Sequence, residues 1–333
     1  MVLGSRFLVH GPRLSLKHSN NMNIVFFGSS DFAVPCLREL SQSGYLVSCV
    51  VTQPDRKKGR GMHLASTQVK TIAQELKLKL YQPQNINSAA AVKFLKGLDA
   101  DLFIVVAYGQ ILSEGVLEIP KIFSINAHAS LLPKYRGAAP ISWSLINGDK
   151  STGVSIIKLT RKMDAGPLIL QKSLEISHDD NSYTLGGKLA ELAAGMLKES
   201  LRLVESDNYK LSPQAEEEVS FAPKLKKADG LIDWGRPATQ INNLIRGCFC
   251  WPGAFTCYKN KLIKLYQAKV APCGIDLQVR PGEVTAVSAE GVTVACAKDA
   301  LVITRLQPEG KRVMDAKDFI SGHQLRPGDC LGK

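Results

Sequence analysis

The sequence lacks any long apolar segment: none of its 333 residues lies in a run of about 18 or more consecutive apolar residues. Because a helix needs about 20 such residues to cross a bilayer, we expect no membrane-spanning helix and no membrane partner. The composition, 45% hydrophobic and 22% charged, is typical of a globular protein. A chain of this length can form two domains.

The sequence also lacks the cysteine patterns that hold disulfides or metals. None of its eight cysteines forms a Cys-x-x-Cys pair. Cys248 and Cys250 are separated by one residue, and a lone Cys-x-Cys is a weak metal signature. We therefore expect reduced thiols in a cytoplasmic protein, and no metal site.

The first 21 residues contain no acidic side chain and three basic ones, Arg6, Arg13 and Lys17. Organellar transit peptides have this character. The alternative is an upstream extension or tail before a start at Met22, where an apolar run begins at once. We favour the extension and expect residues 1–21 to be disordered, because their apolar residues show no clear periodicity.

Apolar runs alternate with helical periodicity over residues 22–206. The run 23–28 ends at a glycine and precedes apolar residues at helical spacing. Buried strands alternating with helices predict an α/β domain with a Rossmann-like, mostly parallel sheet. The predicted strands are 23–28, 46–52, 79–82, 101–107, 122–127 and 153–159, and the predicted helices are 32–40, 67–76 and 185–204.

Two signatures that often accompany such a sheet are absent. The first turn, Gly28-Ser-Ser-Asp-Phe32, lacks the glycines of G-x-G-x-x-G that let a pyrophosphate approach the backbone, which excludes NAD as a cofactor. The nucleophile motif G-x-S-x-G is also missing. A direct attack without a covalent enzyme intermediate therefore fits better than a serine nucleophile.

Residues 207–226 are polar, with an acidic run followed by lysines, and this composition is typical of a linker. Beyond it, a helix at 237–246 and short alternating segments predict a smaller OB-like β-barrel domain at 227–333. The predicted strands are 254–258, 262–270, 282–287, 291–297 and 301–306.

The charge is strongly positive, with a formal net value of +12 and a pI of about 9.3. From residue 226 to the end, sixteen Lys and Arg stand against ten Asp and Glu. A basic barrel of this kind commonly binds nucleic acid. A solvated basic surface without a partner explains the charge equally well.

Asn126 and His128 stand two residues apart at the carboxyl end of the predicted strand 122–127. Ligands bind at this end of the strands in open α/β sheets, and residues i and i+2 point the same way. An amide and an imidazole that face one space can stabilise a developing oxyanion. Taken singly, an Asx turn and a structural histidine explain them as well.

Asp164 is a candidate for the group that orients the histidine. It lies in a turn after the predicted strand 153–159, and a nearby carboxylate favours the protonated imidazole. An aspartate before Gly-Pro is also a common turn residue. The sequence alone does not bring Asp164 and His128 together.

The stretch Asn126-x-His-x-Ser-Leu-Leu-Pro-x-Tyr-Arg-Gly137, with the later Asp164-x-Gly-Pro167, resembles the signature of the folate-dependent formyltransferases. Other stretches narrow the resemblance to the bacterial branch that acts on Met-tRNA, and it extends from about Met22 to the C-terminus. They are Gln53–Gly61, Val106–Leu112, Arg136–Ile141, Ile232–Trp234, Trp251–Pro252 and Leu306–Lys311.

The resemblance implies transfer of a formyl group from 10-formyltetrahydrofolate to the α-amine of methionine on initiator Met-tRNA, for translation initiation. In that reaction the amine attacks the formyl carbon directly. Asn126 and protonated His128 would stabilise the oxyanion of the tetrahedral intermediate, and Asp164 would hold His128. It also implies a bacterial cytoplasmic enzyme, for which a monomer is the default expectation.

The resemblance also implies the residues that bind the two substrates. Those expected around the folate are Val106, Ala107, Tyr108, Gly109, Ile111, Ser130, Leu131, Leu132 and Pro133. Core packing explains Leu131 and Leu132 equally well. Those expected to contact the tRNA are Arg56, Lys57, Lys58, Arg60 and Arg136, and a solvated surface loop is the alternative for the first four.

Three other functions share parts of this pattern. A formyltransferase for a nucleotide-linked amino sugar would use the same catalytic domain, and the basic C-terminal domain and basic loop favour tRNA over it. A hydrolase of formyl-folate would lack the basic module. A binding module with a decayed site is disfavoured by the complete set of Asn126, His128 and Asp164.

Overall fold

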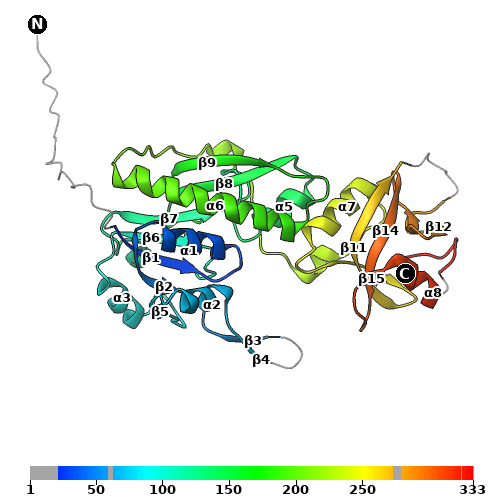
Figure 1. The fold of residues 1–333 in the computed structure, drawn as a ribbon. Coiled ribbons are helices and arrows are strands. Elements are labelled where there is room, and N and C mark those ends of the chain that lie inside the picture. Colours follow the sequence, from blue (N-terminus) through cyan, green and yellow to red (C-terminus); the bar gives the residue numbers. More distant parts are fainter. Residues whose placement is uncertain (1–21, 59–62, 273–278, 324, 333) are drawn as a thin grey trace, which may run out of the picture.

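The computed structural model describes residues 22–58, 63–272, 279–323 and 325–332, arranged as two units side by side (Figure 1). The first contains a seven-stranded sheet flanked by helices, and the second contains a six-stranded antiparallel sheet. The expectations for residues 1–21 and for Arg60 lie outside the described residues.

The first sheet is mostly parallel, as the alternating pattern predicts. Its strand order is β5-β2-β1-β6-β7-β8-β9. The first five strands are parallel, and β8 and β9 run antiparallel to their neighbours. The bounds are β1 Asn23–Gly28, β2 Leu46–Val51, β5 Leu80–Tyr81, β6 Leu102–Val106, β7 Phe123–His128, β8 Ser151–Lys158 and β9 Leu168–Glu175.

Helices cover both faces of this sheet, because alternate residues of one strand point to opposite sides. Ile24 and Phe26 of β1 belong to the core beneath α1 and α6, whereas Val25 and Phe27 belong to a separate core with α3. The helices are α1 Ala33–Gln42, α2 Gln68–Glu75, α3 Ala89–Lys96, α4 Glu114–Leu117, α5 Pro140–Ile146 and α6 Ser182–Glu205.

The strand order places a crevice at the carboxyl ends of β1, β6 and β7. From β1 the chain passes to β2 on one side and later returns to β6 on the other. Ligands of open α/β sheets bind at such a switch point. The turn after β1 is tight: a Cβ on Gly28 would lie 2.8 Å from that of Ala33. The loops that follow β1, β6 and β7 therefore meet at one edge of the sheet.

The C-terminal unit is an antiparallel β domain, as expected. Its pairing path runs β10-β11-β14-β13-β12, with β15 beside β14, and its core includes Trp234, whose indole donates to Thr256. Its elements are α7 Ala238–Gly247, β10 Ala254–Tyr258, β11 Lys261–Ala271, β12 Val284–Ser288, β13 Gly291–Ala295, β14 Ala300–Pro308, β15 Met314–Asp315 and α8 Ala316–His323.

Residues 212–222, here called the strap, belong to the first unit. Ser212 exchanges two backbone hydrogen bonds with Leu168 at the start of β9. Farther along, Arg136 N–H donates to the Ser220 carbonyl, and Ala222 N–H donates to the Arg136 carbonyl. Over this stretch the predicted linker is therefore an integral part of the catalytic unit, which it joins to β9 and to the turn before α5.

The two units meet where α5 packs against α7. Gly247 allows the close approach: a Cβ at this position would lie 2.5 Å from Ile146 and 2.7 Å from the Ser142 carbonyl. Trp143 of α5 donates from its indole to the Pro223 carbonyl just after the strap. The contact between α5 and α7 therefore requires a residue without a side chain at position 247.

Replacing Gly247 with alanine should destabilise the protein, because the added methyl group meets backbone and forces the helices apart. Overpacking of this kind costs about 1–3 kcal/mol. The matched variant Gly195→Ala lies in α6 with open space around its Cβ position, and it should stabilise by roughly 0.5–1 kcal/mol. Thermal unfolding of both variants measures the difference, and equal melting temperatures would contradict this account of the interface.

Candidate active site

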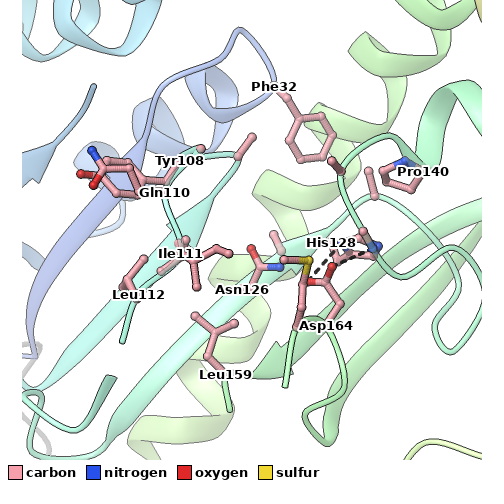
Figure 2. A pocket seen from close by; sticks show the side chains of 18 of the residues that line it. Phe32, Tyr108, Gln110, Ile111, Leu112, Asn126, His128, Pro140, Leu159 and Asp164 are labelled. Atoms are coloured by element: carbon pink, nitrogen blue, oxygen red, sulfur yellow. Dashed lines mark hydrogen bonds and ion pairs between the residues drawn. The ribbon is translucent and has the colours of Figure 1, made fainter. Parts of the chain in front are cut away.

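A cavity of about 650 Å³ opens at the carboxyl edge of the parallel strands (Figure 2). Its wall is mostly apolar, with a few polar groups, which is the usual character of a small-molecule site. The lining residues come from the loops after β1, β6, β7 and β8: Ser30, Phe32, Val105, Ala107–Leu112, Leu117, Asn126–Ala129, Gly137, Ala138, Pro140, Ile141, Leu159–Arg161, Met163 and Asp164.

The three predicted catalytic residues lie together on this cavity. Asn126 and His128 occupy the end of β7, and Asp164 lies in the turn between β8 and β9. His128 Nδ1 is 3.7 Å from Asp164 Oδ1. The Asn126 amide makes no side-chain hydrogen bond to the described part of the chain, and Figure 2 shows it beside the His128–Asp164 pair. Its donor is therefore available to a ligand.

The histidine is fixed by its other ring nitrogen. His128 is 6% exposed, and its Nε2 lies 2.9 Å from the backbone carbonyl of Tyr135. A carbonyl only accepts, so Nε2 carries a hydrogen and donates it. Nδ1 then faces the cavity and the Asp164 carboxylate. Nδ1 can act as a donor there only when the imidazole is doubly protonated, and Asp164 supplies the compensating charge.

Asp164 is held in place by hydrogen bonds to its side chain and to its backbone. Its Oδ2 accepts a hydrogen bond of 2.9 Å from the Gly137 backbone N–H. Its backbone has a φ of 51°, in the left-handed region that non-glycine residues rarely adopt. The Gln214 amide of the strap donates to the Asp164 carbonyl at 2.8 Å and to the Gly166 carbonyl at 2.7 Å. The surroundings therefore compensate for the strained backbone.

Four of the residues expected around the folate line the cavity, namely Ala107, Tyr108, Gly109 and Ile111. Val106 does not, because its side chain points to the core on the opposite face of β6. The loop is anchored through the Tyr108 carbonyl, which accepts from Ser29 and Gln53. Burial raises the pKa of the Tyr108 phenol well above its usual range, so the hydroxyl stays neutral.

Ser130, Leu131, Leu132 and Pro133 do not line this cavity. This differs from the expected contact with the pterin. The Ser155 hydroxyl donates to the Ser130 carbonyl and accepts from the Leu132 N–H. The Ser130 hydroxyl donates to the Lys134 carbonyl. These groups are occupied in holding the turn between His128 and Tyr135, so they position the histidine's partner and leave the cavity wall to other residues.

The residues expected to contact tRNA fall into two sets. Arg56 is exposed on a hairpin of β3 Arg56–Lys58 and β4 His63–Ala65, which includes Lys57 and Lys58 and projects from the first unit (Figure 1). Arg136 is instead 2% exposed and bonded to Gln214 and Glu216. Its guanidinium is therefore engaged inside the protein, and it does not face an approaching nucleic acid.

Sequence reasoning missed most of the apolar wall. Phe32, at the N-terminal end of α1, and Pro140, at the start of α5, line the cavity in Figure 2 together with Leu159. Ile141 of α5 also belongs to the lining. Met163 completes the wall beside Asp164. The only signal for these residues was their position, since the first turn directly follows β1 and the stretch Arg136–Ile141 lies in the connection after β7 and at the start of α5.

Comparison with known proteins identifies the family. The family profile "Formyl transferase" matches residues 22–201, and the profile "Formyl transferase, C-terminal domain" matches residues 224–324. A methionyl-tRNA formyltransferase of Geobacter metallireducens is 42% identical over 312 residues, covering 93% of this chain and 99% of that one. One from Caldanaerobacter subterraneus is 41% identical over 312 residues, covering 93% and 100%.

The chain belongs to the methionyl-tRNA formyltransferase family. Solved structures agree on the fold of this formyltransferase. HypX from Aquifex aeolicus in complex with tetrahydrofolic acid has a TM-score of 0.62 at 17% identity, covering 90% of this chain and 47% of HypX. The sugar 3N-formyl transferase WlaRD also has a TM-score of 0.62 at 17% identity, covering 87% and 99%.

The described residues of this formyltransferase contain no helix long and apolar enough to cross a membrane. They also contain no cluster of three or more His, Cys, Asp or Glu side chains with the geometry of a metal site.

Glu216 links the strap to Arg136 and should make stability depend on pH. The Arg136 guanidinium, and then Lys162, hold the pKa of this carboxyl below its ordinary value. Its contribution is therefore present at neutral pH and is lost as the pH falls through its folded-state pKa. We expect Glu216→Gln to lower the free energy of unfolding at pH 7.

The difference between wild type and Glu216→Gln should narrow as the pH approaches about 4, where glutamates become protonated. Denaturant unfolding at both pH values measures it. The neighbouring exposed Glu217, changed to glutamine, is the matched control and should show a smaller effect. A constant deficit for Glu216→Gln at both pH values would contradict the role of its charge.

Proposed function

We propose that this protein transfers a formyl group from 10-formyltetrahydrofolate to the α-amine of methionine on initiator Met-tRNA. The observation that supports it best is the arrangement of Asn126, His128 and Asp164 on one apolar cavity at the sheet edge. Family membership supplies the reaction class, and the cavity supplies groups suited to it.

The cavity fits a folate donor in size and character. Drug-sized ligands occupy pockets of roughly 300–1,000 Å³ with apolar walls and a few polar groups. Ala107–Ile111 would bound one side, and Phe32 and Ile141 the other. The donor, when bound, supplies an electrophilic formyl carbon for an amine to attack.

The chain's own residues stabilise the charge that this attack creates. The Asn126 amide N–H donates to the oxygen that becomes negative, because no described group of the chain competes for it. His128 Nδ1–H is the second donor, since Nε2 is committed to Tyr135. Asp164 balances the imidazolium, and its carboxylate would take up the proton that leaves the amine and pass it to the folate N10 as the bond between N10 and the formyl carbon breaks.

The proposed acceptor of the formyl group is Met-tRNA. The basic hairpin β3–β4 and the positive C-terminal domain offer cations for phosphates. Arg136 is withdrawn from this role, because it is buried and paired. The fold is shared with the sugar 3N-formyl transferase WlaRD, so an amino-sugar nucleotide is the alternative acceptor, and the basic hairpin favours tRNA over it. We further propose a monomer that works in the cytoplasm, where initiator tRNA is charged.

Transfer of labelled formyl from 10-formyltetrahydrofolate to Met-tRNA tests the reaction. We expect product on Met-tRNA that an amino-sugar nucleotide, added as a competitor, does not reduce. Label on the sugar in preference to the tRNA would sink the proposal.

Changing Asn126 to alanine should lower turnover by ~10²–10³, the usual loss on removal of one oxyanion donor. The affinity for both substrates should change little, because the donor acts on charge that develops during the reaction. Single-turnover kinetics measure this. Asn208→Ala, an exposed position after α6, is the control. Near-full turnover in Asn126→Ala would remove this residue from the mechanism.

Charge reversal at Arg60, which follows β3 in the sequence, should weaken tRNA binding in a salt-dependent way. We expect Arg60→Glu to raise KM for tRNA at low salt and to approach wild type as salt increases. The control is Lys96→Glu at the end of α3, an exposed position on another element. If Arg60→Glu leaves KM for tRNA unmoved, this segment does not bind tRNA.

A further inference from the structure

The buried Arg136 forms a polar cluster with the half-buried Gln214 and the exposed Glu216 of the strap. Arg136 Nε and Nη2 both donate to Gln214 Oε1, at 2.9 and 2.7 Å. Nη2 also donates to Glu216 Oε1 at 2.9 Å. Since a buried guanidinium without partners is strongly unfavourable, Arg136 depends on these two residues of the strap.

The other end of the Gln214 side chain reaches the catalytic turn. Its Nε2 donates to the carbonyls of Asp164 and Gly166, at 2.8 and 2.7 Å. Both amide hydrogens of Gln214 are therefore in hydrogen bonds, and so are the two nitrogens of Arg136 that donate to the Gln214 oxygen. The orientation of the amide is fixed, because the oxygen must face the guanidinium and the nitrogen must face the two carbonyls.

The two segments that Gln214 joins carry the supports of the histidine and the aspartate. Arg136 stands between Tyr135, whose carbonyl accepts from His128, and Gly137, whose N–H donates to Asp164. Gln214 therefore connects the turn that holds both side chains with the backbone of Asp164 itself. The segment between the two family-profile matches, residues 202–223, contains this connection.

We propose that Gln214 is a positioning residue for formyl transfer, acting through Asp164 and Arg136 to keep the His128–Asp164 pair in its reactive geometry. This inference rests on the proposed function for its kinetic consequence. The geometric part of the inference rests on the hydrogen bonds alone. Among the described contacts, the strap holds the backbone around Asp164, whose φ is positive, through the two bonds from Gln214 to the carbonyls of Asp164 and Gly166.

The variant Gln214→Glu isolates these two bonds. Glutamate has the same shape and still accepts from Arg136, but its ionised form has no hydrogen for the carbonyls of Asp164 and Gly166. We expect kcat to fall about 10- to 100-fold, as for a small misplacement of catalytic groups. KM for Met-tRNA and for the folate should stay within about twofold, since Gln214 does not line the cavity.

A readout without substrate separates this inference from the proposed function. The ring resonances of His128, identified by their loss in His128→Asn, should shift in Gln214→Glu. They should stay in place in Glu217→Gln, a charge change on the exposed side of the strap. If wild type transferred no formyl group, the proposed function would fail, and the His128 resonances would still decide the positioning role.

Thermal unfolding accompanies both measurements. Should Gln214→Glu not fold, Gln214→Asn, which is one methylene too short to reach both segments, takes its place with the same expectations. A folded variant with kcat within about twofold of wild type and unshifted His128 resonances overturns the inference. An equal loss of kcat in Glu217→Gln overturns it as well, because the effect would then belong to the charge of the strap.

Discussion

The hydrogen bond between His128 Nε2 and the Tyr135 carbonyl is the constraint on which the site depends. It commits one ring nitrogen to the backbone, and it leaves Nδ1 as the only nitrogen that can face Asp164 and a ligand. The turn from Ser130 to Pro133 exists in this form to present that carbonyl, since Ser155 braces it from β8. The choice of the ring nitrogen that faces the cavity follows from this bond.

The elements that bear the site could be predicted because their burial is two-sided. β1 and β6 are continuous apolar runs, which predict strands buried on both faces. β7 is half polar but buried along most of its length, and its apolar residues Phe123, Ile125 and Ala127 indicated a strand. β9 and the hairpin β3–β4 escaped prediction, since half of the residues of β9 are polar and β3 is entirely basic. α3, Ala89–Lys96, escaped because its small apolar residues give helical and buried-strand patterns alike.

The catalytic residues could be proposed from the sequence, and the wall around them could not. Asn126 and His128 share one strand, so their spacing alone sets their direction. Asp164 could be named only as a candidate, because 36 residues separate it from His128 and the sequence alone does not bring the two together. Phe32 and Met163 are ordinary apolar residues in sequence, and nothing local distinguishes a residue of the cavity wall from one of the core.

The burial of Arg136 could not be predicted from the sequence. The resemblance placed Arg136 among the residues expected to contact tRNA, yet its guanidinium is buried against a glutamine 78 residues away. Burying that charge costs free energy, which the protein offsets only by bringing the strap back across the site. A fold that needed only a tether between two domains would leave those residues in water. The turn that carries Asp164 is therefore completed by the segment that leads to the C-terminal domain, because Gln214 of the strap donates to the carbonyls of Asp164 and Gly166.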